Sequence, residues 1–167
     1  MKGETSPMND SSMSLLARVL PPQNSEESER RGFGCNACAY SEGVPLDWER
    51  GALAEGLVCY GSGRFFQAHE HWESVWLTLQ EPEKSFLRAL IQITAAFHHR
   101  QAGNRAGAVS LLRRALQRLE LCPAHSGGIM VALLCSGVSE WLSAMEGRSL
   151  SIPAALPRIC PLGPAPG

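Results

Sequence analysis

The sequence predicts an all-α fold: a compact bundle of about five helices, with a central buried helix over residues 86–102. Apolar residues recur at helical spacing through five segments between residues 45 and 150. No segment shows the alternating pattern of a strand, so no strand is predicted. Segment 86–102 is apolar nearly all round, which is typical of a helix packed on several sides.

The two ends of the chain differ from its middle in composition. Residues 1–44 are rich in Ser, Pro, Gly and Glu, which favours a disordered leader. Residues 151–167 hold five prolines, which favours an extended tail that at most drapes over the domain. A helical domain is therefore expected over residues 45–150.

The helices are expected at residues 45–60, 64–80, 82–102, 105–121 and 128–145. Gly103 and Asn104 have the types of a helix stop and a helix N-cap, so they predict a tight αα-hairpin between the third and fourth helices. The fifth helix is expected to begin at Gly128 and to place Met130 and Leu133 on its apolar face.

Charge and cysteine usage exclude several classes of function. The formal net charge is −1, which gives no electrostatic case for nucleic acid or an anionic membrane as partner. No secretory signal or membrane span is recognisable, so we expect a soluble cytoplasmic protein with free thiols. Cys35 and Cys38 have thiol-pair spacing without a second pair, and their role stays open.

Polar residues interrupt the inward faces of the second and third predicted helices. His69 and Glu73 are four residues apart and therefore lie one above the other, whereas Glu70 falls at the edge and His71 on the outer side. Gln92 and His99 are seven apart, which also places them on one face. The simplest packing brings the two polar stripes together inside an apolar shell.

Two stretches carry a family resemblance: GRFFQAHEHWESVW from Gly63 to Trp76, and LIQITAAFHHRQAGN from Leu90 to Asn104. Together they resemble the family called domain of unknown function 309. The matching positions are Ala68, His69, Glu70, Glu73, Trp76, Leu90, Ile91, Gln92, His99, Gly103 and Asn104. The resemblance implies a small helical bundle and no known activity. One departure is His98, where the family usually has an apolar or aromatic residue.

The polar cluster has three interpretations. The first, which we favour, is a fully paired buried network that fixes the register of the helices. The second is a zinc or iron site with His69, Glu73 and His99 as ligands and Glu70 as general base. The third is a metal-free pocket with His69 or His99 as acid or base. Its walls would be Trp72, Trp76, Gln92 and Phe97.

The sequence therefore favours a non-enzymatic structural or interaction module without a cofactor. The alternative is a metal-dependent or general acid/base hydrolase that uses His69, Glu70, Glu73 and His99. The sequence names no partner, and either a homo-oligomer or a protein partner would be compatible with it.

Overall fold

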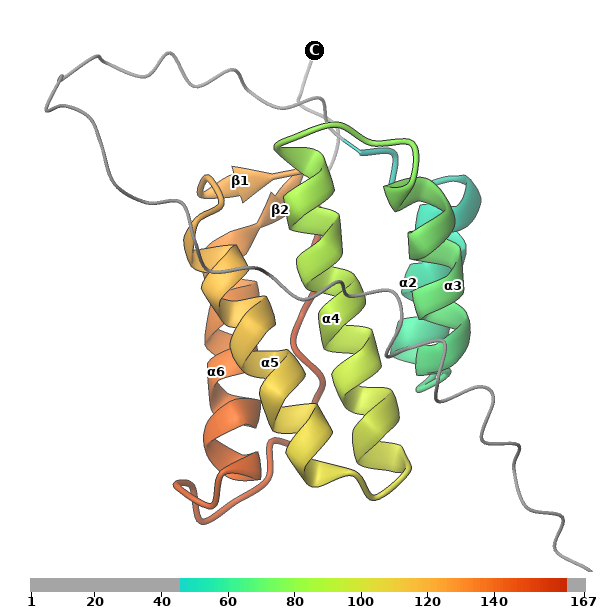
Figure 1. Cartoon of the computed structure of the whole chain (residues 1–167). Coiled ribbons are helices and arrows are strands. Elements are labelled where there is room, and N and C mark those ends of the chain that lie inside the picture. The colour runs from blue at the N-terminus through green and yellow to red at the C-terminus, as the bar shows by residue number, and fades with distance from the viewer. Residues whose placement is uncertain (1–45, 162–167) are drawn as a thin grey trace, which may run out of the picture. The chain divides into compact units, whose positions relative to one another are not determined.

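The computed structural model describes residues 46–161 (Figure 1). Its helices are α2 (Gly51–Gly61), α3 (Phe65–Trp76), α4 (Glu83–Gln101), α5 (Arg105–Glu120) and α6 (Val131–Met145). Two short strands, β1 (His125–Ser126) and β2 (Ile129–Met130), precede α6. The predicted helical fold is confirmed. The predictions for residues 1–44, including Cys35 and Cys38, and for residues 162–167 lie outside the described residues.

Helix α4 occupies the middle of the bundle. Figure 1 shows it between the α2–α3 pair and the α5–α6 pair. Every residue from Ala89 to Phe97 is buried, which confirms the predicted central helix. This burial on several sides explains why the segment lacks the clear polar stripe of a surface helix.

A cluster of aromatic side chains packs α3 and α6 against α4. Phe65 of α3 stacks on Phe97 of α4 with ring centroids 5.3 Å apart, and Trp141 of α6 meets Phe97 edge-on at 5.1 Å. Each such pair contributes about 0.5–1.5 kcal/mol beyond simple burial. The cluster fixes how α3 and α6 sit against the central helix.

Helix α2 approaches α3 closely at a glycine. A Cβ at Gly56 would lie 2.1 Å from the indole nitrogen of Trp72, so no larger residue fits there. That indole nitrogen donates to the Leu53 carbonyl at 3.2 Å. Trp72 is fully buried and belongs to the core, and its contacts with α2 help to hold α3 in place.

The predicted hairpin between α4 and α5 is confirmed. Gly103 has φ of +77°, and the side chain of Asn104 accepts a hydrogen bond from the backbone nitrogen of Gly107 at 2.9 Å. Glycine tolerates the left-handed conformation, and the Asn oxygen satisfies a free donor in the first turn of α5. Both residue types act as the sequence indicated.

The expectation of no strand, with a fifth helix from Gly128, was wrong. Gly127 and Gly128 have φ of +55° and +79°, which permits the tight turn that joins β1 to β2. Helix α6 therefore begins three residues later, at Val131. Met130 and Leu133, which were expected to face the core, are 37% and 49% exposed.

The other helices are shorter than predicted. The first one described begins at Gly51, because Arg50 before it has the extended backbone angles φ −138° and ψ 158°. Trp48, which was expected inside this helix, donates its indole hydrogen to the Gly127 carbonyl. Helix α3 ends at Trp76, and residues 77–82 form the turn to α4. Within residues 46–161, no helix has both the length and the apolar character needed to cross a bilayer.

The described part of the tail is extended and held against the bundle. The Trp141 indole nitrogen donates to the Ala155 carbonyl at 2.8 Å, and the Tyr60 hydroxyl donates to the Pro157 carbonyl at 3.1 Å. A Cβ at Gly137 would lie 2.9 Å from the Pro157 Cα, so this glycine makes room for the tail. The predicted domain boundaries stay predictions.

Candidate functional site

The His69 imidazole lies inside the bundle, as the spacing of α3 predicted. His69 is 5% exposed, and its Nδ1 lies 3.7 Å from a carboxylate oxygen of Glu73, one helical turn on. The Glu73 side chain is 27% exposed, so solvent screens this pair. At 3.7 Å the two atoms are too far apart for a hydrogen bond, and they would form an ion pair only if the imidazole were protonated.

Burial keeps this imidazole neutral. Desolvation lowers the pKa of His69 below its ordinary value of 6.5, the nearby Glu70 carboxylate opposes this shift, and His98 adds to it. Burial also lowers the pKa of His98. At neutral pH, His69 therefore presents one ring nitrogen as a donor and the other as an acceptor.

Three contacts fix the antiparallel register of α3 and α4. Phe65 stacks on Phe97, and Phe66 lies 5.7 Å from the His98 ring. At the other end, Arg88 lies over the Trp76 ring at 5.7 Å. His69 and Glu73 lie between these contacts. We call the polar residues of this region the α3–α4 seam: His69, Glu73, Trp76, Arg88, Gln92 and His98.

The seam is not a fully paired network. Gln92, one turn beyond Arg88 on α4, is 2% exposed, and its side-chain oxygen has no hydrogen-bond partner among the described residues. Three more buried atoms have no hydrogen-bond partner among the described residues: His69 Nδ1, the Trp76 indole nitrogen and, on α5, Arg118 Nε. Most buried polar atoms in proteins are paired, so unpaired ones need an explanation.

His99 makes a different contact from the one expected. Its Nδ1 lies 3.1 Å from the Asn104 side-chain nitrogen, and the Asn104 oxygen is occupied by Gly107. Because an amide nitrogen only donates, Nδ1 of His99 accepts, and its ring proton is on Nε2. His99 thus orients the N-cap of α5. The histidine whose charge acts on His69 is instead His98, which stands where the DUF309 family usually has an apolar or aromatic residue.

The remaining candidates are spread over core and surface. Trp72 and Phe97 are at most 1% exposed and form core packing. Glu70 is exposed, and His71 lies on the outer side, where its Nδ1 is 3.2 Å from a Glu55 oxygen. Among residues 46–161, no three His, Cys, Asp or Glu side chains are grouped so that they could hold a metal ion. Only His69 and Glu73 of the proposed ligands lie together.

Sequence reasoning missed the cations beside Trp76. Lys84 lies over its ring at 5.0 Å, on the same side of α4 as Arg88. Arg118 of α5 lies near enough to Arg88 that its charge lowers the Arg88 pKa, although burial of Arg88 is the larger cause. The spacing of Lys84 and Arg88, four residues apart, was a usable signal. The approach of Arg118 from α5 was not visible in the sequence.

Comparisons with known proteins agree with the motif resemblance. The family model described as Domain of unknown function (DUF309) matches residues 53–111, a stretch that includes the whole seam. An uncharacterized protein of Aquifex aeolicus (strain VF5) is 30% identical over 95 residues, which is 56% of this chain. The match spans 28% of that relative's length, and neither description names an activity. The resemblance to the DUF309 family is therefore confirmed over residues 53–111.

Proposed function

We propose that this chain is a non-enzymatic interaction module whose α3–α4 seam binds a small polar ligand. One observation carries the proposal: buried polar atoms of His69, Trp76 and Gln92 have no partner among the described residues. Each unpaired buried group costs about 1–3 kcal/mol of stability. An apolar side chain of similar size would avoid that cost, so a benefit outside folding would account for the polar one.

The chemistry of the seam indicates what it would bind. The Trp76 indole nitrogen is a donor, the Gln92 oxygen is an acceptor, and the neutral His69 can be either. Four seam residues are only partly buried, so a ligand would reach the buried atoms past them: Glu73, Trp76, Arg88 and His98. A ligand with both donors and acceptors would satisfy the buried atoms, which makes a neutral polar molecule a better match than a simple anion.

A second candidate, general acid/base hydrolysis, has one supporting observation. A neutral imidazole with a carboxylate 3.7 Å away is a suitable proton-transfer pair near neutral pH. Two positions argue against hydrolysis: Glu70 is exposed, and His99 accepts a hydrogen bond from Asn104. The interaction module therefore explains more of the seam.

Native mass spectrometry of the full chain tests both candidates. We expect a bound small molecule on the purified protein that is lost in His69→Leu and kept in His71→Leu, a matched change on the outer side of α3. An adduct with the mass of zinc or iron, lost in His69→Ala, would instead favour the hydrolase. An adduct that survives His69→Leu would contradict the proposed role of the seam.

A further inference from the structure

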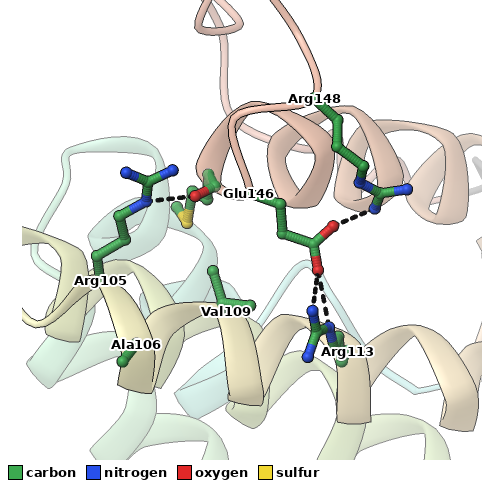
Figure 2. Close-up of a pocket in the computed structure, with 7 residues that line it drawn as sticks. Arg105, Ala106, Val109, Arg113, Glu146 and Arg148 are labelled. Atoms are coloured by element: carbon green, nitrogen blue, oxygen red, sulfur yellow. Dashed lines mark hydrogen bonds and ion pairs between the residues drawn. The ribbon is translucent and has the colours of Figure 1, made fainter.

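A second polar region lies on the other side of the molecule, between α5 and the end of α6. An open cleft of about 920 Å³ lies there, and Figure 2 shows the residues that line it. A hollow of about 340 Å³ shares Arg105 and Met145 with it and adds Arg100. The floor of the larger cleft is apolar, formed by Ala106, Val109 and Met145. We call the two together the α5–α6 cleft.

The cleft is strongly basic although the chain is not. Four arginines line it, Arg100, Arg105, Arg113 and Arg148, against a single acid, Glu146. The whole chain, by contrast, has a formal charge of −1. This local excess of positive charge therefore attracts an anion to this face in particular.

Glu146 and the end of α6 hold three of these arginines in position. Arg113 donates from Nε to one Glu146 oxygen at 2.8 Å, and Arg148 pairs with the other oxygen (Figure 2). Both contacts help to lower the pKa of Glu146, so it stays ionised at neutral pH. Arg105 donates from Nε to the Met145 carbonyl.

Donors remain for a ligand after these contacts. No described residue accepts from the terminal nitrogens of Arg105, and one carboxylate cannot satisfy all the hydrogens of Arg113 and Arg148. Arg105 is also the first residue of α5, where the helix dipole adds positive potential. The side chains of Arg113 and Arg148 are 60% and 63% exposed and so open to solvent.

We propose that the α5–α6 cleft binds the phosphoryl group of a small molecule that has an apolar body. A phosphoryl group carries up to two negative charges and three acceptor oxygens, which suits guanidinium groups approaching from several sides. A carboxylate is satisfied by one arginine fork. The apolar floor beside Arg105 gives the rest of the molecule a surface to cover.

Isothermal titration of the full chain at constant ionic strength tests this proposal with three probes. We expect saturable binding of phenyl phosphate, weaker binding of inorganic phosphate, which lacks the apolar body, and weaker binding of benzoate, which lacks the phosphoryl group. Equal affinity for phenyl phosphate and benzoate would overturn the phosphoryl assignment. Equal affinity for phenyl phosphate and inorganic phosphate would overturn the role of the apolar floor.

Matched arginine variants separate a built site from general surface charge. Arg105→Gln should weaken phenyl phosphate binding about tenfold, the loss expected for one charge-assisted hydrogen bond. Arg148→Gln changes an exposed side chain and should weaken binding without disturbing the fold. Arg114→Gln, an exposed arginine of α5 outside the cleft, should leave the affinity unchanged. Equal losses in all three variants, or no saturable binding by the native chain, would overturn the proposal.

Discussion

The α3–α4 seam and the α5–α6 cleft are both polar, but they differ in how far their polar side chains are buried and paired. In the seam, His69 and Gln92 are 5% and 2% exposed, and each has a polar atom without a hydrogen-bond partner among residues 46–161. In the cleft, Arg113 and Arg148 are more than half exposed and paired with Glu146. Unpaired atoms are costly where water is excluded and cheap where it is present.

This contrast shows that polarity alone does not identify a functional region. The cleft can be explained as a solvated charge network that contributes little to stability. The argument that it binds a ligand therefore depends on its excess of arginine. The seam has buried polar atoms without a described partner, so its case for binding depends on the expected cost of burying them. The two regions therefore need different tests.

The largest expected effect on stability is that of Gly56→Ala. This variant tests whether a change in the core behind the seam affects the cleft. The new methyl group would overlap the Trp72 indole and push α2 away from α3. We expect a loss of about 3 kcal/mol in unfolding free energy, measured by chemical denaturation. Phenyl phosphate binding in the cleft should be unchanged, and a parallel loss there would show that the two regions are coupled.

The pH dependence of stability tests whether the seam holds a neutral imidazole. Because burial lowers the pKa of His69 in the folded state, the unfolded chain takes up the proton first as pH falls below about 6.5. Stability should therefore fall towards pH 5, by up to about 1.4 kcal/mol per pH unit for one proton. Other groups near His69 are Glu70, Glu73 and His98.

Thermal melts across this pH range provide the measurement. His69→Gln should flatten the dependence, while His98 continues to contribute in the same direction because burial lowers its pKa too. His71→Gln, the same substitution on the outer side of α3, is the matched control. An unchanged slope in His69→Gln would mean that the imidazole is not held neutral by the fold.

The smallest effect is expected in the cleft. Glu146→Gln removes the carboxylate that holds Arg113 and Arg148, but these side chains are exposed and water replaces the contacts. The midpoint of thermal unfolding should not change measurably at physiological ionic strength. A clear drop would show that the ion pairs stabilise the fold, and it would remove the contrast between the two regions.

Much of the seam could be predicted from sequence, because it depends on helical spacing within two segments. The positions of His69 and Glu73 on α3, the central place of α4 and the Asn104 cap all followed from local rules. The β-hairpin was missed because Gly128 was interpreted as the start of a helix, whereas Gly127 and Gly128 form a turn. Local rules could not choose between these two conformations.

The failures at the site have a common physical cause. His98 and His99 are neighbours in sequence, and only the packing of α3 and α5 against α4 decides which one lies near His69. The cleft joins Arg105 to Met145 and Glu146, which lie about forty residues further along the chain. Contacts at such separations depend on tertiary packing, so helical spacing alone does not reveal them.

The unfolding free energy of Gln92→Met most directly tests the claim that the seam retains polar atoms at a cost to stability. Methionine has a similar shape and no buried acceptor, so we expect an increase of about 1–3 kcal/mol. Leu90→Met, a buried apolar exchange on the same helix, should lower stability by less than about 1.5 kcal/mol. A Gln92→Met variant less stable than the native chain would contradict the account, because the amide would then be part of what holds the bundle together.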